Sequence, residues 1–287
     1  MSTAALLLVL TAAVLHATWN YFLKKSGGGV GLVALSTVLS SVILTPLAIY
    51  FIIAGHSLTW LEAGVCFGSG VIHTIYFLLL DRAYRSGGDL SVVYPLARAT
   101  GPLLTIVAAT LWLGEKMTLI AFGGAVLIGI SALLLAGNPA SFKGSAARKS
   151  IGFAVAAGCM IAGYTVWDKI AVSVLLMPPL LFYAGSNLSR IPFLVPLALK
   201  RTPGSITIAW RDQRSAALVI AVLSPLSFVL VLYAMTLAPV SYVAPAREVS
   251  ILVAALLGAH ALKEGDVARR MVAAVGMVLG ISALVLG

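Results

Sequence analysis

Charged residues are scarce in this chain. Asp, Glu, Lys and Arg make up 10% of its 287 residues, whereas 61% of the residues are hydrophobic. A soluble globular domain has about 25% charged residues and few long apolar runs. A chain with so little charge cannot cover an aqueous surface. A soluble protein is therefore excluded, and we expect a lipid bilayer as the solvent.

Cysteine is nearly absent too, with only Cys66 and Cys159, which lie within apolar runs and lack metal-ligand spacing. The chain also lacks a Walker sequence, a dinucleotide fingerprint, a metal-ligand cluster and a nucleophile elbow. These absences argue against an ATP-driven pump and against an enzyme, and we expect no cofactor and no metal. The net charge of +10 is not taken as a sign of nucleic-acid binding, because basic cytoplasmic loops produce it in membrane proteins.

Long, continuous apolar runs are what the chain does contain. Only helices and closed barrels can span a bilayer, and barrel strands read as ten-residue alternations, which are missing here. The sequence therefore predicts an all-α polytopic membrane protein. Ten spans of about 20 residues are expected, at residues 4–23, 30–53, 61–81, 90–113, 118–136, 151–172, 178–199, 215–236, 240–262 and 269–286.

The two halves of the chain resemble each other. "GISALLLAG" (129–137) closes the first half and "GISALVLG" (280–287) the second, and "SVVYP" (91–95) matches "SYVAP" (241–245). Because five is an odd number of spans, the second copy must be inverted relative to the first. We expect a 5+5 inverted-topology repeat around a central cavity. Its parts are a first repeat at 1–137, a cytoplasmic linker at 138–150 and a second repeat at 151–287.

Basic residues are concentrated on one side of the expected bilayer. The opposite side has only Lys116 and, at a helix end, Lys169, and the positive-inside rule makes the rich side cytoplasmic. Both termini are then periplasmic in a bacterial inner membrane. The rich side carries 14 of the 19 basic residues: Lys24, Lys25, Arg82, Arg85, Lys143, Arg148, Lys149, Lys200, Arg201, Arg211, Arg214, Lys263, Arg269 and Arg270.

Three charged residues, Arg98, Arg247 and Glu248, fall near the middle of spans. A charge at the bilayer centre costs at least ~2.5–3.5 kcal/mol, so it needs a partner or a task. Pro95 aligns with Pro245 between the halves, which brings Arg98 and Glu248 to matching positions. Arg247 and Glu248 point about 100° apart on a helix, so we expect one of them to pair with another helix. An Arg98–Glu248 bridge and a substrate-binding role remain alternatives.

Other polar residues fall in short stripes on four spans and are candidates for lining the same cavity. Trp19 and Trp167 also fit an interfacial aromatic belt, Asp168 fits an exposed helix end, and a neutral histidine bonded to a carbonyl would explain His73. With Arg98, Arg247 and Glu248, the candidate substrate-binding residues are Tyr94, His73, Tyr76, Tyr164, Trp167, Asp168, Trp19 and Asn20.

"LGEKMT" (113–118) matches "LKEGDV" (262–267), so that Glu115 and Glu264 follow the fourth and ninth spans. With the segments 83–104 and 241–258, this pattern resembles the EamA-type transporters of the drug/metabolite transporter superfamily, over the full chain. The resemblance implies alternating access to a central cavity, gated by the third, fourth, eighth and ninth helices. It also implies a small-molecule substrate, since family members export amino acids or other small metabolites.

The leading hypothesis is a secondary transporter of a small polar metabolite, either an amino-acid-like zwitterion or a small organic anion. Arg98 and Arg247 would attract a carboxylate, while Glu248 or Asp168 would hold an ammonium or a coupling proton. A monomer that exports or exchanges its substrate is expected. The alternatives are a multidrug or organic-cation exporter, which would favour aromatic cages, and uptake of a phosphonate-type compound.

The charge distribution predicts that tags at Met1 and Gly287 are accessible from the periplasm. Fusions to a reporter that is active only outside the cytoplasm should therefore be active at either end. Cytoplasmic reporters that are active at both ends would contradict this orientation.

Overall fold

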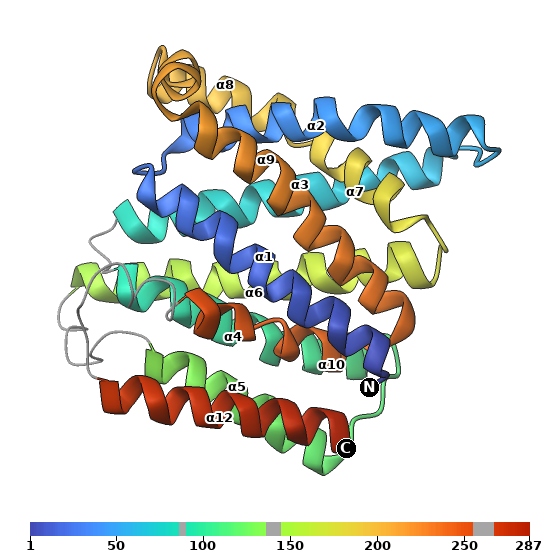
Figure 1. Ribbon diagram of the computed structural model, residues 1–287, viewed down its shortest axis with the longest axis vertical. Coiled ribbons are helices and arrows are strands. Elements are labelled where there is room, and N and C mark those ends of the chain that lie inside the picture. Colours follow the sequence, from blue (N-terminus) through green and yellow to red (C-terminus); the bar gives the residue numbers. More distant parts are fainter. Residues whose placement is uncertain (86–89, 136–144, 255–266) are drawn as a thin grey trace.

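The computed structural model describes residues 1–85, 90–135, 145–254 and 267–287, and all regular structure in these ranges is helical (Figure 1). The helices of the first half are α1 (Thr3–Lys25), α2 (Val30–Ile53), α3 (Trp60–Arg85), α4 (Leu90–Trp112) and α5 (Leu119–Leu135). Those of the second half are α6 (Ser145–Ser173), α7 (Pro179–Leu188), α8 (Ile191–Arg201), α9 (Ser205–Leu237), α10 (Val240–Ala246) and α12 (Val267–Leu286). The predicted all-α class is confirmed.

Two of the ten expected spans are interrupted. The span expected at 178–199 is divided into α7 and α8 at Ser189–Arg190. The span expected at 240–262 begins as α10, is interrupted at Arg247–Glu248 and continues as helix through residues 249–254, beyond which it lies outside the described residues. The expected span 215–236 is the longer α9, whose non-helical Gln213 separates its first turns from the rest.

The helices present apolar surface outward, as a bilayer requires. Five described helical stretches are long and apolar enough to cross a membrane, namely those in α1, α2, α3, α6 and α9. Shorter apolar stretches lie in α4, α5 and α12. Large side chains such as Trp112 and Leu119 are exposed, Leu119 to 89%. Exposed apolar surface of this extent indicates contact with lipid, because water would disfavour it.

The break between α7 and α8 follows from Pro192. Its nitrogen carries no hydrogen for the carbonyl of Leu188, and its ring would clash with that carbonyl if the helix continued. Accordingly, α7 ends at Leu188, and Pro192 lies in the first turn of α8. The sequence analysis missed this break, although a proline inside a helical pattern is its usual signal.

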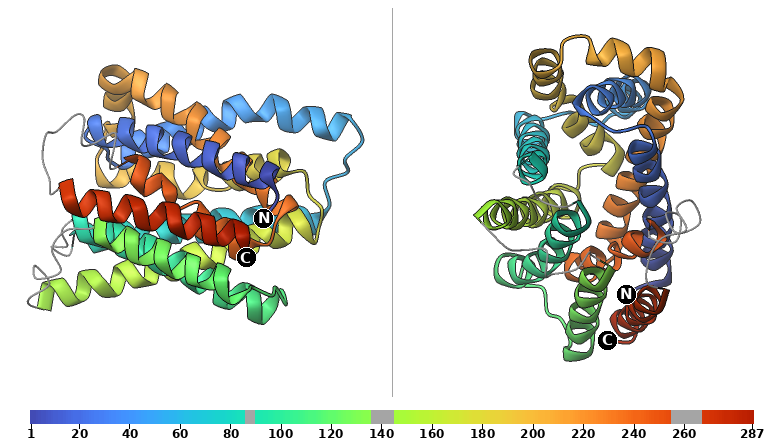
Figure 2. Two further views of the ribbon diagram at one scale, coloured as in Figure 1. Left: turned by 60° about the horizontal axis from the view of Figure 1, so that its bottom comes forward. Right: turned by 90° about the vertical axis from the view of Figure 1, so that its left-hand side faces the viewer.

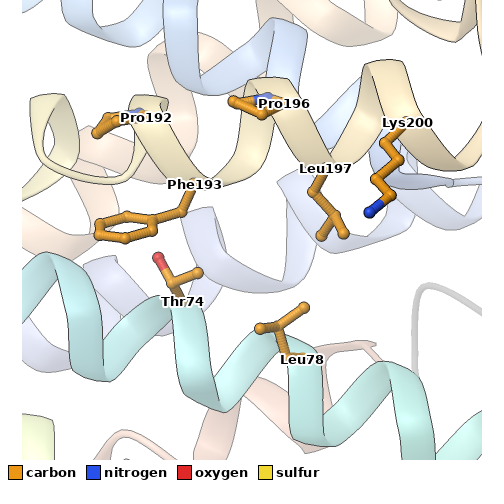
Figure 3. A pocket seen from close by; sticks show the side chains of 7 residues that line it. All are labelled: Thr74, Leu78, Pro192, Phe193, Pro196, Leu197 and Lys200. Carbon is orange, nitrogen blue, oxygen red and sulfur yellow. The ribbon is translucent and has the colours of Figure 1, made fainter.

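A shallow groove of about 320 Å³ lies between α3 and α8. Figure 3 shows Phe193 and Leu197 of α8 pointing toward Thr74 and Leu78 of α3, with Lys200 at one end. Its lining is almost wholly apolar, and none of the predicted site residues contributes to it.

The helix packing has the same pattern in both halves. Helix α1 packs on α9 and α6 packs on α3, while α4 packs on α6 and α10 packs on α1. Exchanging each helix for its counterpart five spans later interchanges these pairs, as a two-fold relation between inverted repeats requires. The two termini lie at the same end of the molecule (Figures 1 and 2). The boundaries 1–137, 138–150 and 151–287 remain a prediction.

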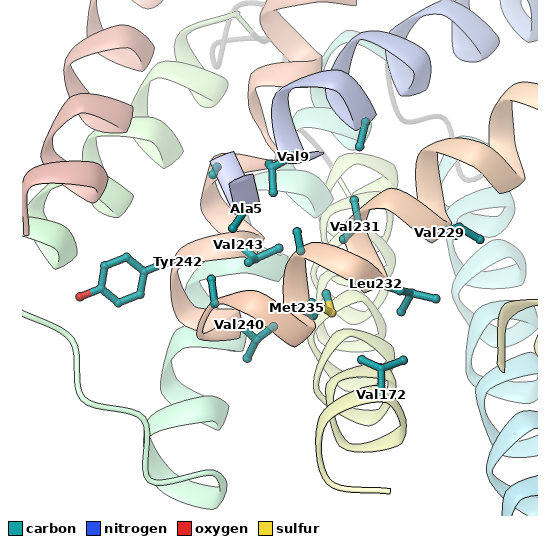
Figure 4. Packing of buried hydrophobic residues seen from close by; sticks show 14 of the residues in the cluster. Ala5, Val9, Val172, Val229, Val231, Leu232, Met235, Val240, Tyr242 and Val243 are labelled. Atoms are coloured by element: carbon teal, nitrogen blue, oxygen red, sulfur yellow. The ribbon is translucent and has the colours of Figure 1, made fainter. Parts of the chain in front are cut away.

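The largest apolar cluster joins elements far apart in the sequence. Val9 of α1, Val172 of α6 and Met235 of α9 pack with Val240 and Val243 of α10 (Figure 4). Because α10 is short, packing and not helix propensity must stabilise it. The cluster therefore fixes the segment that leads to Arg247 and Glu248.

Helices α5 and α12 are in close contact at Gly124 and Gly280. A Cβ atom added to Gly124 would lie 2.5 Å from the Gly280 carbonyl oxygen, whereas one added to Gly123 would meet nothing within 4 Å. We predict that Gly124→Ala lowers the free energy of unfolding by about 1–3 kcal/mol, the usual cost of overpacking. The matched control Gly123→Ala should not, because it changes helix propensity alone. Thermal unfolding of the purified variants measures this, and equal melting temperatures would refute the close contact.

Candidate functional site

The ninth span is interrupted where its two charges lie. Pro245 cannot donate a backbone hydrogen bond, and the following turn tightens, with the Glu248 amide donating to the Pro245 carbonyl at 3.0 Å. Helix α10 ends at Ala246, and Arg247 and Glu248 form a turn. Arg247 keeps helical backbone angles in this turn, and both side chains are buried.

Glu248 and Arg98 form a buried ion pair. The Arg98 Nε lies 3.0 Å from the Glu248 Oε2, and the Arg98 Nη2 donates to the Ser250 hydroxyl at 2.8 Å. Both charged side chains are about 3% exposed. The contact joins α4 of the first half to the ninth span of the second. The predicted bridge is thus present, and it neutralises Arg98.

Arg247 faces aromatic rings instead. Its guanidinium carbon lies 5.4 Å from the centre of the Phe228 ring, and its Nη2 is 3.5 Å from the Tyr164 hydroxyl. Within the described ranges, no carboxylate lies within ion-pair distance of Arg247, although the residue is only 7% exposed. Burying a guanidinium without a counter-charge costs free energy, and a negatively charged ligand would offset that cost.

Aromatic side chains connect Arg247 to α3 and α7. The His73 ring stacks on Tyr164 with centroids 4.0 Å apart, and Tyr76 meets Tyr164 edge-on at 5.9 Å. Phe228 contacts His73 at 5.4 Å and Tyr183 at 5.2 Å. The structure therefore brings three of the predicted residues, His73, Tyr76 and Tyr164, into one cluster.

Asp168 is buried in this cluster and does not lie at an exposed helix end. Its Oδ1 accepts a hydrogen bond from the Ser69 hydroxyl at 2.7 Å, and Ser69 in turn accepts one from Ser186 at 2.9 Å. The residue is 1% exposed, because α3 and α7 cover this part of α6. The side chain of the neighbouring Lys169 extends to the end of α9, where its ammonium donates to the Met235 and Ala238 carbonyls.

The sequence analysis did not select Arg190, which falls within the span expected at 178–199. It lies at the break between α7 and α8, with its guanidinium carbon 5.7 Å from the centre of the Tyr183 ring. Its Nε and Nη2 atoms are buried and have no hydrogen-bond partner in the described part of the chain. Its charge acts on both His73 and Asp168. The only sequence feature that could have identified Arg190 as a site residue is its position inside an expected membrane span.

Trp167, Trp19 and Asn20 make their contacts outside this cluster. Trp167 is 37% exposed, and its indole donates to the Val65 carbonyl at 2.9 Å. Asn20 donates to the His16 carbonyl of its own helix at 2.8 Å, and Trp19 packs edge-on against His16. His16 itself lies within electrostatic reach of Arg98 and Arg247. The Tyr94 side chain lies outside the described side chains.

Glu115, in the "GE" pattern after the fourth span, has a clear structural task. Its two carboxylate oxygens accept hydrogen bonds from the amides of Val240 and Ser241, both at 2.9 Å. These amides are free donors at the start of α10, where a carboxylate is also favoured by the helix dipole. Glu115 therefore fixes the start of α10, the helix that leads to Arg247. Its expected counterpart Glu264 lies outside the described residues.

Apolar helices around buried charges at interrupted spans define a polytopic membrane protein with an internal polar site, the design of a transporter. Residues 148–286 match the family model described as the EamA-like transporter family. The match covers 139 of the 287 residues, in the second half of the chain, and this part belongs to a family of transporters.

One protein of known crystal structure supports the fold over the whole chain. It is 15% identical, with a TM-score of 0.80, and the alignment covers 100% of this chain and 98% of the other. At this identity the likeness shows the fold alone. No protein among the curated sequences matches the chain.

The Arg98–Glu248 pair predicts a specific loss of stability. Glu248→Gln leaves Arg98 buried without a counter-charge, and we expect the free energy of unfolding to fall by about 3–5 kcal/mol. The matched control is Asp212→Asn, which breaks a solvent-exposed pair with Arg211 and should have little effect. Thermal unfolding of both variants measures this difference. Equal melting temperatures for Glu248→Gln and the wild type would show that the pair does not stabilise the fold.

Proposed function

We propose that this transporter moves a small polar metabolite with a carboxylate group, such as an amino-acid-like zwitterion, by alternating access. The observation that supports this most strongly is the buried Arg247 guanidinium, which has aromatic neighbours and, among the described residues, no carboxylate within ion-pair distance. A guanidinium binds a carboxylate through two parallel hydrogen bonds. Arg247 would anchor the substrate, while Arg98 serves mainly in its pair with Glu248.

The negative group that would receive the substrate's ammonium is Asp168. It is buried on α6, and the charge of Arg247 acts on it. A zwitterion has both charges that such a pair of groups would bind. Glu248 is the other carboxylate in reach of Arg247, but it is already paired with Arg98. Asp168 is therefore favoured over Glu248 for an ammonium or for a coupling proton.

The proposed cycle uses the interrupted spans. The breaks at Ser189–Arg190 and Arg247–Glu248 lie beside the charged groups, and interrupted helices provide both binding groups and hinges in transporters. Movement of α3, α4, α9 and α10 would open the site to either side. We propose export or exchange by a monomer in a bacterial inner membrane, with periplasmic termini.

Export of an organic cation is the second candidate. The rings of Tyr164, Phe228 and Tyr183 beside Asp168 favour it, because aromatic rings and a carboxylate attract cations. Three buried or half-buried arginines, Arg98, Arg190 and Arg247, count against it. Uptake of a phosphonate would use the same Arg247 and is distinguished only by the substrate.

Counterflow in proteoliposomes tests the proposal. Vesicles loaded with an unlabelled amino-acid mixture should accumulate labelled amino acids when the protein is present. Arg247→Gln should weaken apparent affinity by about 10- to 100-fold, the equivalent of one charged hydrogen-bonding contact. Arg247→Lys should fall between, because it keeps the charge but loses the planar fork. Arg211→Gln, at an exposed site, is the matched control.

Two outcomes would contradict this proposal. Exchange of a labelled quaternary ammonium compound without amino-acid exchange would favour the organic-cation exporter. Unchanged affinity in Arg247→Gln would remove Arg247 from the substrate site.

A further inference from the structure

Two buried atoms with unused lone pairs face each other between α3 and α6. The Nε2 of His73 lies 4.0 Å from the Oδ2 of Asp168. Neither atom has a hydrogen-bond partner in the described ranges, and both side chains are buried. An unsatisfied buried polar atom costs about 1–3 kcal/mol. Two such atoms facing each other need an explanation beyond packing.

The surrounding contacts determine which protons are present. The His73 Nδ1 lies 2.9 Å from the Ser69 carbonyl oxygen, which can only accept, so Nδ1 carries the hydrogen. In a neutral imidazole, Nε2 then has a bare lone pair. The single hydrogen of the Ser69 hydroxyl is donated to Asp168 Oδ1 at 2.7 Å. The Ser186 hydroxyl donates to Ser69, so neither serine hydroxyl has a hydrogen left for the gap.

We propose that His73 and Asp168 form a proton-binding site, in which one proton binds to Asp168 Oδ2 and is donated to His73 Nε2. The proton comes from water on whichever side the site is open. A shortening of the 4.0 Å separation by about 1 Å gives an ordinary hydrogen bond. A neutral acid beside a neutral imidazole is favoured here, since burial disfavours charged forms.

The side chains around the gap fit this role. Tyr164 stacks on His73 with an interplanar angle of 21°, and Phe228 meets its edge, so the imidazole orientation is fixed. The charged and titratable groups that face Asp168 are Arg190, Arg247, His73, Tyr183 and Cys66. The positive charges of Arg190 and Arg247 stabilise the negative charge of Asp168 while the proton is absent. The site therefore has two stable forms, one with the proton and one without.

The same two acceptors would also suit an ammonium group. A nitrogen about 2.8 Å from each of two acceptors is compatible with their 4.0 Å separation. An ammonium and a proton would then exclude each other at Asp168, which is the basis of exchange. This part of the inference rests on the proposed function, whereas the proton site itself does not.

Infrared difference spectroscopy of the purified, ligand-free protein tests the site. Acidification should produce the C=O absorption of a protonated carboxylic acid, and Asp168→Asn should remove it. Asp212→Asn, at an exposed carboxylate, is the matched control and should leave the band intact. His73→Phe keeps the stacking ring but removes Nε2, so the band should persist at higher frequency. A band that is absent from the wild type, or unchanged in Asp168→Asn, would overturn the proposal.

Methylammonium chloride serves as the probe for the shared site, with sodium chloride as the ionic-strength control. At fixed pH, methylammonium should decrease the carboxylic-acid band, because it competes with the proton. A band that responds equally to both salts would overturn the shared site. Since this measurement needs no transport, a failure of amino-acid counterflow would count against the proposed substrate and not against the proton site.

Discussion

The buried ion pair between Arg98 and Glu248 is the contact on which the rest of the site depends. It joins the fourth and ninth spans at 3.0 Å, with both side chains almost fully buried. Removing two charges from water is expensive, and close pairing only offsets that cost. The pair therefore serves to fix the two spans relative to each other. Because Glu248 is paired with Arg98, Arg247 has no carboxylate within ion-pair distance among the described residues.

Arg247 and Glu248 are adjacent in the chain, yet they contact different helices. Because neighbouring residues in a helical turn point about 100° apart, Glu248 meets Arg98 of α4 while Arg247 faces Phe228 of α9. The turn at Arg247–Glu248 follows Pro245, and Glu115 restrains the start of α10 by accepting from its first amides. The "GE" pattern and the "PARE" segment are thus parts of one structure, although about 125 residues separate Glu115 from Val240.

Sequence reasoning predicted the helical class and most span boundaries, because the runs that set them are local. It did not predict the break at Ser189–Arg190, whose cause is a proline four residues after the end of α7. The burial of Asp168 could not be predicted either. Its position near a helix end permits an exposed charge, and only the packing of α3 and α7 on α6 removes it from solvent.

Trp167 and Asp168 are adjacent candidate site residues that end up in different surroundings. The two are adjacent on α6, yet one contacts Val65 at the surface while the other is enclosed with Ser69 and Ser186. Gly68 permits this, since a Cβ there would lie 2.7 Å from the Trp167 ring. The same turn of α3 therefore supplies the space for the indole on one side and the hydroxyl for the carboxylate on the other. Small residues on α3 determine which groups of α6 enter the polar site, and composition alone carries no such information.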